Sequence, residues 1–170
     1  MDTALDTEGN AGSATAAKTL ALEDFYVGQR FRSGSATLDA EAIKAFARSF
    51  DPQPFHLDEA AAKATFFEGL AASGWHTAAL TMRLLVEGGF PVQGGIIGAG
   101  GSVTWPRPTR PGDTLTVESE VLEITPSKSR PGRGFVTVRS TTLNQKGEPV
   151  QVLDAKLLVH GRQRMPEAIA

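Results

Sequence analysis

The sequence predicts an α+β domain in which an antiparallel β-sheet wraps around a long central α-helix. Helical periodicity dominates the first half of the chain, and its last helix, at about residues 74–87, is apolar nearly all round. A helix of that kind should be surrounded by other structure. From residue 98 the hydrophobic period changes to two, which is typical of strands. Helices followed by a run of strands indicate the α+β class.

The composition suits one globular domain with a real core. The 170 residues are 41% hydrophobic and 21% charged, and the formal net charge of -2 excludes a chain that is basic enough overall to bind nucleic acid or an anionic membrane. The absence of cysteine excludes disulfides, thiolate nucleophiles, cysteine-ligated zinc and iron–sulfur clusters. We see no targeting segment and no apolar run of about 18 residues, so we expect a cytoplasmic protein.

We expect three segments. Residues 1–21 are small and polar and are predicted to be a flexible leader, residues 22–162 the folded domain, and residues 163–170 a tail. There is no internal repeat, heptad seam or second domain.

An amphipathic helix is predicted from about residue 40 to residue 50. Asp39 or Thr37 can cap it, and Ala40, Ile43, Phe46, Ala47 and Phe50 recur on one face. Two prolines forbid its continuation, so residues 51–57 are expected to be irregular. Asp58 can then cap a short helix from Glu59 to about Thr65.

The apolar helix is expected from Gly74 to Glu87, with Ser73 as its N-cap and two glycines at its end. Its predicted buried stripe, widened by Leu80 and Leu84, comprises Trp75, Ala78, Ala79, Met82, Leu85 and Val86. The strands that follow are predicted near residues 102–105, 114–124, 135–143 and 150–160, with a hairpin turn at residues 144–147 and a basic, flexible loop at residues 126–133.

The segment Phe50-Asp51-Pro52-Gln53-Pro54-Phe55-His56 carries the most chemical information. It holds a carboxyl group and an imidazole five residues apart on a backbone that two prolines stiffen. Proton-transfer chemistry needs such rigidity, and together Asp51 and His56 could hold and polarise one water. The spacing alone also fits a structural role, with Asp51 ending a helix and His56 bound to a backbone carbonyl.

The start of the apolar helix is a second candidate. Gly74 allows close approach of a ligand, and the unpaired N–H groups of a first helical turn, together with the helix dipole, stabilise developing negative charge. The alternative is an ordinary serine cap at Ser73.

These motifs resemble those of the MaoC-like dehydratases, which include the (R)-specific enoyl-CoA hydratases. That family carries Asp-x-Asn-Pro-x-His-x-Asp after a helix, then a small-residue turn that opens the central helix, then a Pro-Gly-Asp-Thr-Leu turn. The chain matches with Asp51, Pro54, His56 and Asp58, with Gly74, and with Arg107 to Leu115 (Arg-Pro-Thr-Arg-Pro-Gly-Asp-Thr-Leu). The resemblance spans about residues 22–160. Gln53 stands where the family has Asn, and Ser73 where it usually has His.

The resemblance implies a hot-dog fold and a lyase of fatty acid metabolism that hydrates 2-enoyl thioesters or dehydrates 3-hydroxyacyl thioesters. Asp51 and His56 would activate water, and the Gly74 N–H would bind the thioester oxygen. We expect an acyl-CoA or acyl-carrier thioester as substrate, no further cofactor, no nucleic-acid partner, and a homodimer or dimer of dimers. The expected substrate-binding residues are Gln53, Pro54, Phe55, Ser73, Trp75, Arg107 and Arg110.

The remaining candidate residues have simpler structural interpretations. His76 is expected in the core or an interface, and His160 on the surface. No metal site is expected, because Asp58 serves better as a helix cap than as a ligand beside Asp51 and His56. The arginines at 107 and 110 could grip CoA phosphates or be solvated loop charges, and Trp105 could pack or line an acyl tunnel. Two rival functions remain, a hot-dog thioesterase and a non-catalytic acyl-thioester binding protein.

Overall fold

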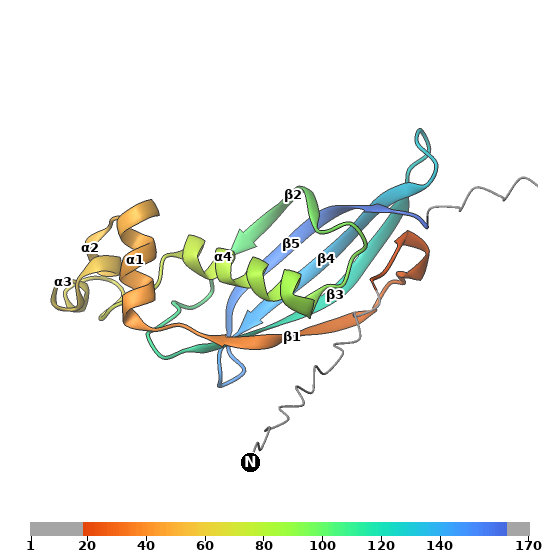
Figure 1. Ribbon diagram of the computed structural model, residues 1–170. Coiled ribbons are helices and arrows are strands. Elements are labelled where there is room, and N and C mark those ends of the chain that lie inside the picture. The colour runs from red at the N-terminus through yellow and green to blue at the C-terminus, as the bar shows by residue number, and fades with distance from the viewer. Residues whose placement is uncertain (1–18, 163–170) are drawn as a thin grey trace, which may run out of the picture.

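A five-stranded antiparallel sheet curves around one long helix in the computed structural model, which describes residues 19–162 (Figure 1). Most of the predicted leader and all of the predicted tail lie outside the described residues. In chain order the elements are η1 (Leu22–Asp24), β1 (Arg30–Thr37), α1 (Ala40–Phe50), α2 (Pro54–Leu57), α3 (Glu59–Lys63), α4 (Gly74–Leu84), the π-helical turn η2 (Leu85–Gly89), β2 (Ile97–Thr104), β3 (Thr114–Pro126), β4 (Arg133–Leu143) and β5 (Pro149–His160). The predicted α+β hot-dog fold is confirmed.

The strands lie in the order β1-β3-β4-β5-β2, and each neighbouring pair is antiparallel. The hairpin between β4 and β5 turns where the sequence predicts it. The Gly147 N–H donates to the Asn144 carbonyl at 2.9 Å, and Gly147 has a φ of +75°, which favours glycine. β2 lies at one edge of the sheet and pairs only with β5 among the described strands.

The core lies between α4 and the concave face of the sheet. Every second residue of β3 and β4 is buried along most of each strand, as the period of two predicts. The buried cluster includes Leu80 and Leu84 of α4 together with Leu115, Val117, Val121, Val136, Val138, Val150 and Val159 of the sheet.

The buried face of α4 and of the turn after it agrees with the prediction only in part, since Leu80, Leu84 and Leu85 are buried as expected. Of the expected buried stripe, Trp75 is 61% exposed, Met82 41% and Val86 66%. The buried face also carries two threonines, Thr77 and Thr81, both fully buried. Hydrophobicity could not fix the rotation, because the helix is apolar nearly all round. The helix also changes to a π-helical turn at Leu85 before the two glycines.

Helices α1 to α3 cluster beyond the N-terminal end of α4 (Figure 1). Their predicted caps are confirmed, since the Asp39 and Asp58 carboxylates each accept a backbone N–H at 2.7 Å. The segment expected to be irregular contains one helical turn, α2, because Pro54 can occupy the first helical position without losing a hydrogen bond. Phe50 is 73% exposed, although periodicity placed it on the buried face.

None of the helices within residues 19–162 is long and apolar enough to cross a membrane.

Candidate active site

Local backbone structure brings Asp51 and His56 together. Asp51 ends α1, where its N–H bonds to the Ala47 carbonyl, and Pro52 stops the helix. The chain re-enters a helical turn at Pro54, and this turn carries His56 back toward the end of α1. His56 Nε2 then lies 3.4 Å from Asp51 Oδ2, and the two side chains are 5% and 18% exposed. The structure therefore places side by side the two groups for which the sequence predicts a shared role, and that role stays a prediction.

The loop before α4 orients the imidazole. His56 Nδ1 lies 2.7 Å from the Ala71 carbonyl oxygen. A carbonyl oxygen only accepts hydrogen bonds, so Nδ1 carries the proton and Nε2 is the atom that faces Asp51. In a neutral ring, Nε2 therefore keeps a lone pair that can accept a proton from a bound water.

Polar side chains around Asp51 hold it in its charged form. Its Oδ1 accepts a hydrogen bond from Gln53 Nε2 at 2.7 Å. Burial acts to raise the pKa of Asp51, but hydrogen bonds from Ser73 and Gln53 and the charge of His56 outweigh it, so the pKa lies below its ordinary value of 3.8. Asp51 is a carboxylate at neutral pH, and it can accept a hydrogen bond or a proton from water.

The N-terminus of α4 borders the same pair. The Ser73 hydroxyl caps the helix by accepting the Trp75 N–H at 3.2 Å. The preceding amide, that of Gly74, donates to no other described group, which leaves it open to a ligand. A Cβ built on Gly74 would lie 2.7 Å from the Trp105 ring. Only glycine lets the indole lie this close to the helix start.

These groups line one cleft of about 500 Å³. Asp51, His56 and Gly74 lie in it together. The walls combine aromatic rings with two buried hydroxyl groups, those of Thr77 and Thr109, which are hydrogen-bonded to each other at 3.0 Å. The other lining residues are Gln53, Phe55, Phe66, Phe67, Ala72, Trp75, Trp105, Pro106, Arg107 and Pro108. A mostly apolar cleft with a few convergent polar groups is typical of small-molecule sites.

Three residues expected to bind substrate do not line the cleft. Pro54 begins α2, Ser73 is 1% exposed behind the site, where it caps α4 and supports Asp51, and the Arg110 guanidinium turns away to bind backbone carbonyls. Each contacts the scaffold in this structure, and a role of these three residues in binding substrate stays a prediction. Gln53, Phe55, Trp75 and Arg107 do line the cleft.

Sequence reasoning missed the support beneath the cleft. Gln151, fully buried in β5, accepts the Trp105 indole N–H at 2.8 Å and donates to Thr81 Oγ1 at 3.1 Å. Thr81 is in turn hydrogen-bonded to Thr142 at 2.7 Å. The hydrophobicity pattern did not predict this network, because a Thr or Gln in a strand is expected to face solvent.

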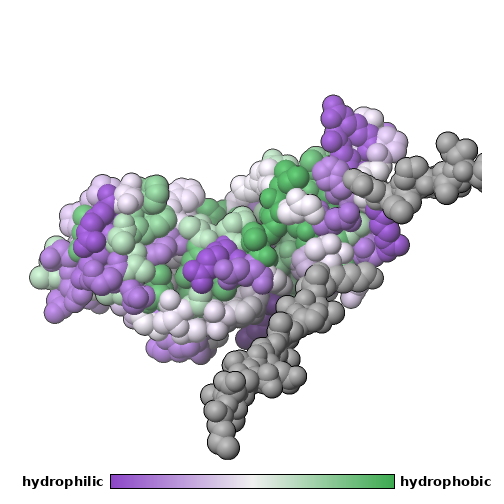
Figure 2. Space-filling view, viewed as in Figure 1, coloured by the Kyte–Doolittle hydropathy of each residue, from purple (hydrophilic) through white to green (hydrophobic). Residues whose placement is uncertain are grey.

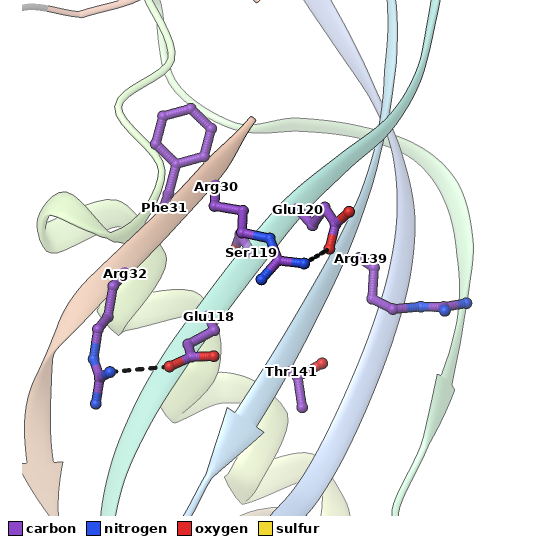
Figure 3. Close-up of a pocket in the computed structure, with 8 residues that line it drawn as sticks. All are labelled: Arg30, Phe31, Arg32, Glu118, Ser119, Glu120, Arg139 and Thr141. Carbon is purple, nitrogen blue, oxygen red and sulfur yellow. Dashed lines mark hydrogen bonds and ion pairs between the residues drawn. The ribbon is translucent and has the colours of Figure 1, made fainter. Parts of the chain in front are cut away.

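A second hollow, of about 520 Å³, lies on the convex face of the sheet (Figure 3). Its charged groups neutralise one another. Arg30 pairs with Glu120 and Arg32 with Glu118, each at 3.0 Å, and Arg139 pairs with Asp154 at 2.7 Å. Such exposed pairs contribute little to stability and leave no uncompensated charge for a ligand. The hollow lacks the mix of acid, base and open amide found in the cleft.

The other two histidines do not line the cleft. The His76 ring stacks on Phe46, with centroids 4.5 Å apart, and burial lowers the pKa of His76. His160 is exposed at the end of β5. His160 lies on the surface as expected, and His76 is packed as expected, but its buried Nδ1 has no hydrogen-bond partner within residues 19–162.

The fold and cleft are those of a hot-dog protein with a paired acid and base, and comparison with known proteins gives the family. Residues 24–144 match the family described as MaoC like domain, and the chain belongs to this family. The MaoC-like dehydratase from Rhodospirillum rubrum is 63% identical, with a TM-score of 0.84 over 85% of this chain and 99% of that one.

Two further relatives are more distant. The uncharacterized protein YdeM of Bacillus subtilis (strain 168) is 36% identical over 139 residues, which cover 81% of this chain and 96% of YdeM. The (R)-hydratase from A. caviae involved in PHA biosynthesis is 31% identical, with a TM-score of 0.64 over 79% of this chain and 97% of that one. The predicted family resemblance is therefore confirmed.

Proposed function

We propose that this protein catalyses the reversible hydration of a 2-enoyl thioester to a 3-hydroxyacyl thioester, with coenzyme A as the thiol. One observation carries the proposal: His56 Nε2 and Asp51 Oδ2 lie 3.4 Å apart in a cleft that also contains the open Gly74 amide. An acid–base pair next to an oxyanion donor is the arrangement that addition of water to a conjugated thioester needs.

The reaction uses the pair to move one proton. Water held between Asp51 and His56 gives up a proton to the pair as its oxygen bonds to C3 of the enoyl group. The C2–C3 π electrons move toward the carbonyl, whose growing negative charge accepts a hydrogen bond from the Gly74 N–H. A proton from the pair then bonds to C2, so the pair returns to its starting charge. Dehydration is the same sequence in reverse.

The cleft also contains groups suited to the rest of the substrate. Arg107 is an exposed lining residue whose guanidinium donates to the Pro149 carbonyl at 3.4 Å, and its remaining N–H donors can bind a phosphate of coenzyme A. The Phe55 and Trp75 side chains supply apolar surface for the acyl chain. The name of the A. caviae relative, an (R)-hydratase, supports the same reaction class.

Turnover of enoyl-CoAs of increasing length, beginning with crotonyl-CoA, tests the proposal through loss of enoyl absorbance. We expect activity in the wild type and a fall in kcat of roughly 10²–10⁴-fold in Asp51→Asn and His56→Ala. His160→Ala is the matched control, because His160 is an exposed histidine outside the cleft, and it should keep wild-type activity. Equal rates in all four proteins would contradict the assignment.

The same samples separate the rival functions. A thioesterase would release free thiol from saturated acyl-CoA, which a thiol reagent detects. A binding protein would give a calorimetric binding isotherm for enoyl-CoA with no hydrated product by mass spectrometry. Either result, without hydration, replaces the lyase proposal.

We also propose that two copies of the chain form a homodimer through α4 and β2. Met82 of α4 and Val86 of η2 are exposed apolar side chains. Figure 2, viewed as in Figure 1, shows hydrophobic surface on the side of the molecule that carries α4. Among the strands of residues 19–162, β2 pairs only with β5, which leaves its other edge open. Its sequence Ile-Gly-Ala-Gly-Gly-Ser-Val-Thr carries neither a charge nor a proline. Edge strands that stay unpaired usually carry such residues, so this one is suited to pairing with another chain.

A further inference from the structure

Arg110 binds the backbone of a loop that lies more than thirty-five residues before it in the chain. Its guanidinium donates to the carbonyls of Gly69 at 2.9 Å and Leu70 at 3.2 Å, and also to that of Phe67. All three carbonyls belong to the connection between α3 and α4. A guanidinium offers five N–H donors in a fixed plane, so it can hold several acceptors at once, which an ammonium group cannot do in the same geometry.

The bound loop contains a backbone conformation that needs support. Glu68, which lies between Phe67 and Gly69, has a φ of +54° and is the one non-glycine residue with positive φ within residues 19–162. This left-handed conformation costs on the order of 1 kcal/mol for a residue with a Cβ. It turns the chain so that the carbonyls on either side of Glu68 point to the same guanidinium.

The loop continues directly into the group that orients His56. Leu70, which Arg110 binds, precedes Ala71 in the chain. The Ala71 carbonyl accepts a hydrogen bond from His56 Nδ1 at 2.7 Å. The loop is also fixed on its far side, where the Ala72 N–H donates to the Thr109 carbonyl at 2.9 Å. Thr109 and Arg110 thus hold the two residues that flank Ala71.

Arg110 is itself held in place. Its backbone N–H donates to Asp113 Oδ2 at 2.7 Å, and Asp113 Oδ1 accepts from Gln145 Nε2 at 3.1 Å. Asp113 is 7% exposed, so this support is anchored in the body of the domain. The backbone of Arg110 is therefore held by the turn before β3 and by the hairpin between β4 and β5, and not by the loop that its guanidinium binds.

From these contacts we propose that Arg110 is a positioning residue for His56. It holds the segment Phe67–Leu70 so that the Ala71 carbonyl fixes the Nδ1–H tautomer of His56, which leaves Nε2 facing Asp51 and the cleft. Its effect on catalysis rests on the proposed hydratase activity, but its effect on the tautomer does not.

Nitrogen-15 NMR of the three histidines tests the tautomer directly. Spectra are recorded at pH 8.5, well above the ordinary histidine pKa of about 6.5, and His56→Ala assigns the signals. In the wild type, His56 should show protonated Nδ1 and unprotonated Nε2. Arg110→Met should give a mixture of the two tautomers, while the His76 and His160 signals stay unchanged. Arg32→Met, which removes an arginine from an exposed ion pair on the convex face, is the matched control and should leave all three unchanged.

Arg110→Lys decides the question if Arg110→Met does not fold. It keeps the charge but loses the planar fork, so it should also show mixed tautomers at His56. Should a folded Arg110 variant retain the pure Nδ1–H tautomer, the proposal is overturned.

Steady-state kinetics of the same variants test this proposal separately from the proposed function. If the wild type is a hydratase, we expect kcat of Arg110→Lys to fall roughly 10–100-fold with little change in KM, as for a misplaced catalytic group. A rise in KM alone would instead assign Arg110 to substrate binding. If the wild type shows no turnover, the lyase assignment fails while the NMR result still decides the role of Arg110.

Discussion

The indole ring of Trp105 occupies the space where a side chain at Gly74 would begin. A Cβ at position 74 would approach three atoms of this ring at 2.7–3.0 Å. The indole cannot simply turn away, because its N–H is hydrogen-bonded to the buried Gln151. The start of α4, the Trp105 indole and Gln151 of β5 are therefore in contact with one another, and these contacts fix the position of the Gly74 amide.

The first prediction concerns this contact. Gly74→Ala should destabilise the protein by about 1–3 kcal/mol, because an overpacked site forces side chains from their preferred positions. It should also lower kcat, since a displaced indole alters the space beside the Gly74 N–H. Denaturant unfolding measures the first effect and enoyl-CoA turnover the second. In a Trp105→Ala background the same substitution should cost much less, and an equal cost in both backgrounds would show that the contact is unimportant.

The second prediction concerns the side chain beneath the indole. Gln151→Leu removes partners from the Trp105 N–H and the Thr81 hydroxyl, and we expect a loss of about 1–3 kcal/mol, the usual cost of unsatisfied buried polar groups. Trp105 fluorescence should shift, because the partly exposed ring is freed to move. Val152→Leu, in the next, half-buried position of β5, is the control. Similar unfolding free energies for the two variants would count against a structural role for the network.

How far the sequence could predict this site depends on the kind of interaction. Asp51 and His56 were predictable, because the prolines around them constrain the backbone locally. Gln151 was not, because its partners lie 46 and 70 residues away and no local pattern joins them. The orienting partner of His56 is a backbone carbonyl, which any residue type could supply.

The same reasoning explains the errors in the fold. Helix α4 was predicted at its correct start, since a serine cap and the following glycine are local signals. Its buried face was predicted only in part, because Thr77 and Thr81 are buried through hydrogen bonds to Thr109 and Thr142 that hydrophobicity does not reveal. The start of β2 at Ile97 was missed because its glycines lack the β-branched residues that mark a strand.

The third prediction follows from the lowered pKa of Asp51. Its carboxylate form is favoured in the folded state, so it contributes stability that is fully present above the unfolded pKa, near 3.8, and is lost as the pH falls through the lower folded pKa. Asp51→Asn cannot titrate, so its unfolding free energy should fall less steeply than that of the wild type below pH 4. Parallel acid-unfolding curves would contradict the environment described for Asp51. Gln53→Ala, which removes one hydrogen bond to the carboxylate, should raise the pKa of Asp51, as carboxyl carbon NMR can measure.

The fourth prediction concerns His76. The pKa of this residue is lowered because its ring is partly buried. The unfolded state takes up a proton first as the pH falls, so the stability that neutral His76 contributes is present above pH 6.5 and is lost as the pH falls through its lower folded pKa. His76→Phe keeps an aromatic ring against Phe46 and removes the titration. We expect its unfolding free energy to fall less between pH 8 and pH 5 than that of the wild type. An identical fall in both proteins would mean that His76 gains its proton as easily when folded as when unfolded.

The last prediction tests the proposed homodimer. Val86 is 66% exposed, so Val86→Glu costs a monomer little, whereas in a dimer interface it would bury an unpaired carboxylate. We expect the dimer dissociation constant to rise at least roughly 100-fold, equivalent to about 2.7 kcal/mol, as measured by sedimentation equilibrium. Ser49→Glu adds the same charge to an exposed position on α1 and should leave the association unchanged. If the wild type sediments as a monomer, or if the two variants associate equally, then the apolar face formed by α4 and η2 is not the surface through which two copies meet.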